Sequence, residues 1–245
     1  MAPWAEYVEL MPPLLGAVLS NLLFMSPIPT VMKVRSEASL GNANPLPYIV
    51  MLANNICWCS YGSMIRDKFQ WWANGPGMVM TSYYVVTTLN LAPLGSKQRF
   101  NLEMTFMTLA SVVASGIYMS SIVSEDTDEG RLIVAWLTQI INVLMYAAPL
   151  STISTVLKNK SANSIDPRLA VMSFVNTSMW LLYGLTSTDI YVWLPASLGS
   201  TFAAAQLALI ALFWRRDHHD KSSAESAHNS AATQQRRQTH PKADT

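Results

Sequence analysis

Two asparagine–tryptophan pairs in this sequence have the residue types and spacing to bind a small ligand. Asn54 and Trp58 are four residues apart, as are Asn176 and Trp180, so each pair shares one face of a helix. An asparagine amide donates and accepts hydrogen bonds, which suits vicinal hydroxyl groups, and tryptophan adds a flat apolar face with an N–H at its edge. A lone asparagine often only joins two helices. Because an amide in hydrocarbon is costly unless it meets a partner or a cavity, the paired arrangement predicts a pocket.

The elements that must position these pairs are long apolar helices. Hydrophobic residues make up 51% of the chain and charged residues 13%, against about a quarter charged in soluble domains. Seven stretches carry no charge: 10–32, 45–65, 69–94, 104–124, 132–157, 169–188 and 190–214. Each is close to the roughly 20 apolar residues that cross a bilayer core, whereas a core helix of a soluble protein keeps a polar face. We therefore expect an all-α membrane protein with seven transmembrane helices in a lipid bilayer. The net charge of +1 gives no sign of nucleic acid binding.

Lysine and arginine in the short loops predict the orientation of the chain. The loops after spans one, three and five carry seven of them: Lys33, Arg35, Lys97, Arg99, Lys158, Lys160 and Arg168. The loops after spans two, four and six carry three: Arg66, Lys68 and Arg131. This excess predicts an N-terminus outside and a C-terminus in the cytosol, and we expect the plasma membrane. The segment 215–245 is polar and without aromatic residues, so we expect a disordered cytosolic tail.

An internal repeat relates two parts of the chain at an offset of 180 − 58 = 122 residues. Twelve identities fall in the 51 positions 27–77, where composition alone would give roughly three. In the first copy they are Pro27, Thr30, Val34, Ser39, Pro45, Asn54, Trp58, Tyr61, Gly62, Asp67, Trp71 and Gly77. Four spans separate equivalent helices, so both copies have the same orientation. We predict two parallel three-helix bundles, 10–94 and 131–214, joined by a linker transmembrane helix, 101–124, in a 3+1+3 arrangement.

The repeated motifs resemble those of the SWEET family of sugar transporters over about residues 10–214. The first copy contains Ser26-Pro27-Ile28-Pro29-Thr30, Asn44-Pro45-Leu46-Pro47, Trp58-Cys59-Ser60-Tyr61-Gly62, Asp67 and Asn74-Gly75. The second contains Ala148-Pro149-Leu150-Ser151-Thr152, Trp180-Leu181-Leu182-Tyr183-Gly184 and Asp189. The family has Pro-Asn in its seventh helix where this chain has Pro195-Ala196, so the asparagine expected opposite Asn74 is missing. The resemblance implies a bidirectional facilitative sugar transporter, a uniporter that works by alternating access of two helical halves.

The resemblance also implies roles for single residues. To the two asparagine–tryptophan pairs it adds Ser20, Leu23, Asn74, Asn142 and Met145 as substrate-binding residues. It implies hinges at an inner gate at Pro27, Pro45, Pro149 and Pro167, although a plain helix start would explain Pro45 and Pro167 alone. It implies an outer gate in which Tyr61 contacts Asp189, with Tyr183 and Asp67 beside them. For this group, interfacial tyrosines and helix-capping aspartates are the alternative.

The absence of certain residue types from the spans argues against proton coupling and against an enzyme. None of the seven spans contains Asp, Glu, Lys, Arg or His, and a proton relay needs an ionisable group at membrane depth. We therefore expect downhill transport without a cofactor. There is no zinc motif or nucleophile elbow, which disfavours an enzyme.

Two other functions stay open at this stage. A related three-helix-repeat carrier of an amino acid or organic acid would want a charge at membrane depth, and a non-transporting membrane scaffold would not need symmetric pairs. Leu23 and Met145 are equivalent at the 122 offset and both are long, so we expect hexoses to be preferred over sucrose. We also expect a homo-oligomer.

Overall fold

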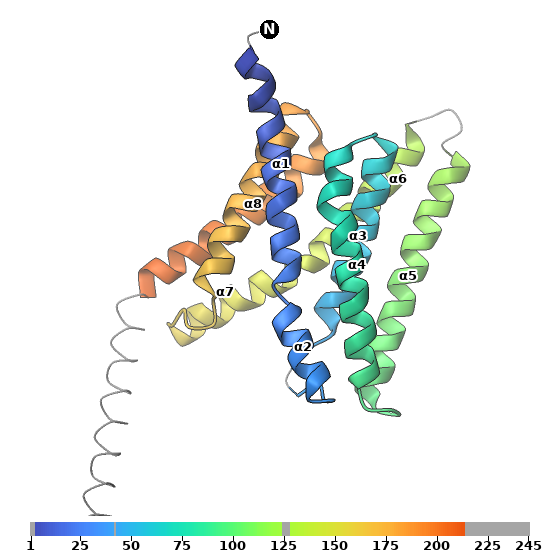
Figure 1. The fold of residues 1–245 in the computed structure, drawn as a ribbon, viewed down its shortest axis with the longest axis vertical. Coiled ribbons are helices and arrows are strands. Elements are labelled where there is room, and N and C mark those ends of the chain that lie inside the picture. The colour runs from blue at the N-terminus through green and yellow to red at the C-terminus, as the bar shows by residue number, and fades with distance from the viewer. Residues whose placement is uncertain (1–2, 42, 124–127, 214–245) are drawn as a thin grey trace, which may run out of the picture.

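Residues 3–41, 43–123 and 128–213 are described by the computed structural model, and every regular element within them is a helix (Figure 1). The labelled helices are α1 (Pro3–Met25), α2 (Ile28–Ser36), α3 (Leu46–Met64), α4 (Lys68–Leu91), α5 (Lys97–Val123), α6 (Glu129–Met145), α7 (Ala147–Asn159) and α8 (Pro167–Thr186). A last helix, Ile190–Phe213, follows them. The expected tail, 215–245, and the final residues of the fourth and seventh expected spans, 124 and 214, lie outside the described residues.

Two of the expected spans are each built from two helices. α1 and α2 form one apolar segment, Leu10–Ser36, and α6 and α7 form another, Glu129–Asn159. Pro27 caps α2 at the first break, and the second break lies at Tyr146, three residues before Pro149. A proline inside a helix removes a backbone hydrogen bond, so a break beside each of these equivalent prolines is expected. As a result α2 and α7 lie at the same end of the bundle (Figure 1).

Five helical segments are long and apolar enough, by length and composition, to cross a membrane: Leu10–Ser36, Lys97–Ile122, Glu129–Asn159, Pro167–Thr186 and Ile190–Phe213. α3 and α4, which cover the second and third expected spans, are not among them. Their polar side chains explain the difference. Asn54, Asn55, Gln70 and Asn74 are all buried, so they lower the mean hydropathy of these two helices without being exposed to lipid.

The two halves pack on each other through equivalent helices. α1 contacts α8, and α3 contacts α6. At the 122-residue offset α1 corresponds to α6 and α3 corresponds to α8, so the two contacts are equivalent to each other. α1 and α3 also pack on α4 to complete the first bundle, and α5 lies against α3 and α6 (Figure 1). In the second bundle, Val156 of α7 and Ala170 of α8 share a buried cluster with Ile210 of the last helix. The interface between the halves is therefore formed by α1, α3, α6 and α8.

The repeat extends to the geometry of the turns. Four described residues other than glycine have a positive φ, and they form two pairs 122 residues apart: Ala38 (49°) with Lys160 (51°), and Arg66 (55°) with Thr188 (54°). Such angles are uncommon for residues with a side chain. Their recurrence at equivalent positions shows that both halves turn in the same way after their first and second spans.

Candidate functional site

A cavity of about 310 Å³ lies between the two halves, at the lower end of the roughly 300–1,000 Å³ that small-molecule sites occupy. Its lining includes eight of the nine residues predicted to bind substrate: Ser20, Asn54, Trp58, Asn74, Asn142, Met145, Asn176 and Trp180. The ninth, Leu23, is not in the lining, and its neighbour Phe24 is. Ala196, which stands where the resemblance leads us to expect asparagine, also lines the cavity.

On the α8 side of the cavity the polar groups satisfy one another. The Trp180 Nε1–H donates to Ser20 Oγ at 3.1 Å, and the Ser20 hydroxyl donates to Asn176 Oδ1 at 3.1 Å. A Cβ on Gly16 would lie 3.0 Å from the indole of Trp180, so a glycine at this point of α1 lets the ring lie close to the helix. These bonds join α1 to α8 across the interface between the halves.

On the α3 side the equivalent groups are left without partners. Asn142 corresponds to Ser20 at the 122 offset, and Asn54 corresponds to Asn176. Both asparagines are buried, and neither Asn54 Oδ1 nor Asn142 Nδ2 has a hydrogen-bond partner. A buried polar group without a partner costs about 1–3 kcal/mol. One acceptor and one donor thus lie unpaired beside Trp58 at the wall of the cavity. A rotation of these side chains toward the cavity would let them bind a ligand that can offer both a donor and an acceptor, as a pair of hydroxyl groups can.

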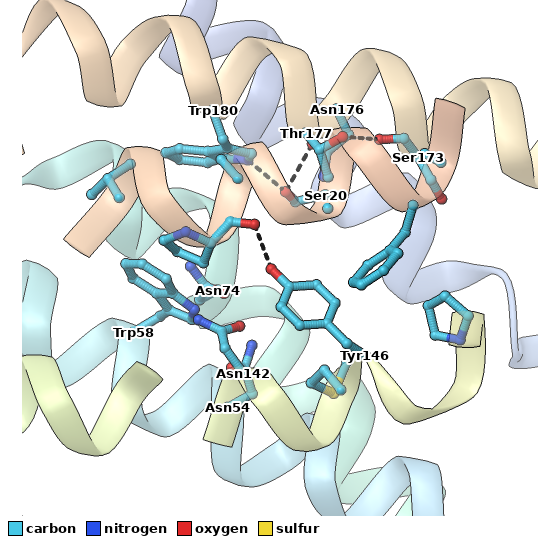
Figure 2. Close-up of a pocket in the computed structure, with 18 of the residues that line it drawn as sticks. Ser20, Asn54, Trp58, Asn74, Asn142, Tyr146, Ser173, Asn176, Thr177 and Trp180 are labelled. Carbon is cyan, nitrogen blue, oxygen red and sulfur yellow. Dashed lines mark hydrogen bonds between the residues drawn. The ribbon is translucent and has the colours of Figure 1, made fainter. Parts of the chain in front are cut away.

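Figure 2 shows the two sides facing each other, with Trp58, Asn142 and Asn54 across the cavity from Trp180, Ser20 and Asn176. Asn74 lies beside the first group, and its Nδ2 donates to the Gln70 carbonyl at 2.9 Å. The side chains of the two tryptophans bound the cavity from opposite halves. The arrangement offers apolar ring faces together with amide edges, which is the chemistry of a polyhydroxylated ring with C–H faces.

Aromatic pairs at one end of the cavity obey the same symmetry. Trp58 meets Tyr61 edge-on at 6.0 Å and 79°, and Trp180 meets Tyr183 at 5.9 Å and 72°. The Tyr61 hydroxyl donates to Asp189 Oδ2 at 2.7 Å, which is the contact that the resemblance implies. A reciprocal bond, from the Tyr183 hydroxyl to Asp67 Oδ2 at 2.9 Å, joins the halves a second time. The 122-residue offset could have predicted this second bond.

The two aspartates also cap helices. Asp67 Oδ1 accepts the N–H of Phe69 at 2.8 Å, and Asp189 Oδ1 accepts the N–H of Tyr191 at 2.9 Å. The sequence left two alternative roles for these aspartates, a contact between the halves and a helix cap. In the structure each carboxylate has both roles. Capping fixes each aspartate in place, so that its second oxygen is held ready for the tyrosine of the other half.

A second cavity, of about 780 Å³, lies on the far side of these bonds. Tyr61, Asp67, Tyr183 and Asp189 line it, and Val192, which is 3% exposed, lines both cavities. The tyrosine–aspartate bonds and Val192 therefore separate the inner cavity from this polar vestibule. In the described conformation the inner cavity is closed on the tyrosine side.

The four predicted hinge prolines fall into two kinds. Pro27 and Pro149 lie at the breaks within the first and fifth spans, and Pro149 also lines the cavity. Pro45 caps α3 and Pro167 begins α8, as expected for prolines at helix starts. The structure thus associates an interrupted helix with Pro27 and Pro149 alone, while the role of all four as hinges stays a prediction.

Several lining residues were not predicted from the sequence. Tyr146, the equivalent of Phe24, donates its hydroxyl to the Pro195 carbonyl, and its ring lies 5.3 Å from that of Phe202. Gln70 is 2% exposed and its Nε2 has no partner. A usable signal existed for Gln70, because it lies four residues before Asn74 on the same helix face. For Tyr146, the signal was its position beside Met145 at the break.

The family model described as "Sugar efflux transporter for intercellular exchange" matches residues 13–93 and 132–218 of the chain. Among characterised relatives, the chain is similar to the bidirectional sugar transporter SWEET5 of Arabidopsis thaliana, with 27% identity over 85% of this chain and 89% of the relative. It is 32% identical to the bidirectional sugar transporter SWEET4 of Oryza sativa subsp. indica, over 79% of this chain and 75% of the relative. The solved structure of a eukaryotic SWEET transporter superposes with a TM-score of 0.76 at 24% identity, covering 85% of this chain and 98% of that one. This likeness confirms the predicted fold of seven transmembrane helices in a 3+1+3 arrangement.

Proposed function

This chain belongs to the SWEET family of sugar efflux transporters, and on that premise we propose that it carries sugars in both directions across a membrane, down their concentration gradient. The observation that carries the proposal is the unpartnered acceptor and donor, Asn54 Oδ1 and Asn142 Nδ2, beside Trp58 in a cavity between the halves. A sugar supplies vicinal hydroxyls for the amides and C–H groups for the indole rings.

We propose that the predicted residues bind the sugar from both halves. One face of the site consists of Asn54, Trp58 and Asn142 and contains the two unpaired amide atoms. The opposite face consists of Asn176 and Trp180. Ser20, Asn74 and Met145 also line the cavity, whereas Leu23 does not and Phe24 does. Their common presence in the cavity lining, Leu23 excepted, supports this assignment.

Transport without proton coupling is supported by the chemistry of the cavity. Among the described residues that line it there is no Asp, Glu, Lys, Arg or His. A group that changes its charge at membrane depth is what proton coupling requires. The same feature argues against an amino acid or organic acid as substrate, since the charge of such a ligand would need a counter-charge there.

Alternating access would use the two tyrosine–aspartate bonds as the outer gate and the interrupted helices as the moving parts. With the N-terminus outside, as the excess of basic residues in the opposite loops supports, the described conformation faces the cytosol. Opening outward then requires that both bonds break while the halves close at the end of the cavity near Pro149. We further propose the plasma membrane, a homo-oligomer, and hexoses as preferred substrates, since Met145 narrows a cavity of only about 310 Å³.

The test is uptake of labelled glucose, fructose and sucrose into proteoliposomes that contain the purified full-length chain. We expect glucose to equilibrate in both directions, at a rate that does not change when a pH gradient is imposed. Accumulation of glucose above its outside concentration, driven by the pH gradient alone, would refute uniport. Uptake of none of the sugars by correctly inserted protein would refute the transport function.

A further inference from the structure

A groove on the outer surface of the first bundle combines apolar walls with two positive charges. It has a volume of about 690 Å³ and lies along the start of α4, outside the transport cavity. Arg66 and Lys68 line one end, where the groove adjoins the vestibule that they also line, and Pro76, Met78 and Val79 line the other end. Trp71 and Trp72 lie between the ends and are 47% and 68% exposed. Tryptophan at this level is typical of the boundary between membrane and water.

We propose that this groove binds one anionic phospholipid of the outer leaflet, with its phosphate on Arg66 and Lys68 and an acyl chain beside Pro76 and Val79. Both cations are exposed, and neither has an ion pair with any residue in the described part of the chain. Arginine and lysine both bind phosphate oxygens well. The dipole at the start of α4, a helix of 24 residues, favours negative charge in the same place.

The length of the groove fits one leaflet of a bilayer. From Lys68 to Val79 there are eleven residues of helix, which span roughly 16 Å at 1.5 Å per residue. Half of a hydrocarbon core of about 30 Å is about 15 Å. A phosphate at Lys68 would therefore place the acyl chain along α4 down to the middle of the membrane.

The walls of the groove are held by contacts of their own. The Trp71 Nε1–H donates to Ser63 Oγ at 2.6 Å, and its ring lies 3.0 Å from where a Cβ on Gly75 would be. Pro76 has no N–H to give to the Trp72 carbonyl four residues earlier, and Asn21 Nδ2 of α1 donates to that carbonyl instead, at 2.9 Å. Contacts within the protein therefore define the shape of the groove without a ligand.

The internal repeat shows that these charges are specific to the first bundle. Trp71 has an equivalent in Trp193, but Arg66 corresponds to Thr188, Lys68 to Ile190 and Pro76 to Leu198. The fold thus tolerates uncharged residues at these positions. Asp67 also lines the groove, and its two oxygens accept hydrogen bonds from Phe69 N and the Tyr183 hydroxyl. Its carboxylate stays charged, so the formal charge of the groove is +1 and still favours an anion.

Native mass spectrometry of the purified full-length chain, titrated with phosphatidylglycerol or with phosphatidylcholine of the same acyl chains, tests the proposal. We expect one phosphatidylglycerol to be retained in preference to phosphatidylcholine. Because each cation would contact the phosphate directly, removing one should weaken retention about fivefold, and removing both about 30-fold. Arg66→Gln with Lys68→Gln should show this loss, whereas the control Lys97→Gln with Lys158→Gln, at exposed cations of the opposite loops, should not.

Filling the groove separates a seated lipid from simple attraction to charge. Val79→Trp keeps both cations and should also reduce retention of phosphatidylglycerol several-fold. Equal retention of the two lipids, or no effect of the double glutamine variant or of Val79→Trp, would overturn the proposal. It would also be overturned if the glutamine variant split an oligomer into monomers without changing the lipid count, because a second copy of the chain would then cover the groove.

Discussion

Replacing Asn142 by leucine should separate the binding role of this asparagine from a role in joining helices. Its Nδ2 is buried without a partner, so the folded protein without sugar bears a cost of about 1–3 kcal/mol for it. Leucine has a similar size and no polar atom, so the substitution should leave the free energy of unfolding unchanged or raise it by up to about 2 kcal/mol. For a chain of this length each kcal/mol corresponds to about 2–4 °C in Tm.

Sugar affinity should move in the opposite direction. A hydrogen bond between an amide and a hydroxyl contributes about 0.5–1.5 kcal/mol net, so losing one should weaken binding about 2- to 12-fold. The assays are thermal unfolding of the purified protein without sugar, and equilibrium binding of labelled glucose. The two readouts together test both halves of the argument.

Asn176→Leu is the matched control, because Asn176 accepts a hydrogen bond from Ser20 at 3.1 Å. Its replacement should lower stability by about 1 kcal/mol, in addition to any loss of affinity. If Asn142→Leu destabilises the protein as much as Asn176→Leu and leaves glucose binding unchanged, Asn142 joins helices and the reasoning about the cavity is wrong.

Three further outcomes are expected. Tyr61→Phe and Tyr183→Phe should each remove a hydrogen bond to a carboxylate, worth about 1.5–3 kcal/mol. Each should raise the rate at which an impermeant thiol reagent outside labels Ala196→Cys, a position that lines the inner cavity and not the vestibule; equal rates with and without the hydroxyls would show that these bonds do not hold the gate closed. Met145→Val should shift the ratio of glucose to sucrose uptake toward sucrose, because it widens the cavity, and an unchanged ratio would show that Met145 does not limit substrate size. Asn159 lies in the sequon Asn159-Lys160-Ser161 but should carry no glycan in cells, and a glycan found there by mass spectrometry would reverse the proposed topology.

The interrupted helices show how much of the fold local sequence patterns can predict. Charge-free stretches located the spans, because a bilayer requires apolar runs of a set length, and the proline positions marked where two of them would be weakened. Pro27 and Pro149 fall inside charge-free stretches and accompany a break, whereas Pro45 and Pro167 stand at or just before the start of such stretches and begin helices. The sequence therefore already distinguishes the two kinds of proline.

The site likewise has features that the sequence predicts and features that it does not. The residue types at a fixed offset were enough to predict Asn54, Trp58, Asn176 and Trp180 as a group, since a repeat copies side chains from one half to the other. The missing partner of Asn54 was not predictable, because the equivalent positions 20 and 142 hold serine and asparagine and only their surroundings decide which bonds form. Leu23 was expected in the lining from the resemblance and from its equivalence to Met145 at the 122 offset, but Phe24 of α1 lines the cavity instead.

By itself, the sequence determined the class of fold, the number of spans and the two-fold repeat, because these depend on hydropathy and on identities along one chain. Only the tertiary structure decided that Asp67 and Asp189 each cap a helix and also accept a hydrogen bond from the tyrosine of the other half, and that one face of the cavity is satisfied while the other is not. These features depend on how two nearly equivalent halves approach each other. The relative position of the two halves, to within the length of a hydrogen bond, is set by many packing contacts between helices that are far apart in the chain. No local sequence pattern contains that information.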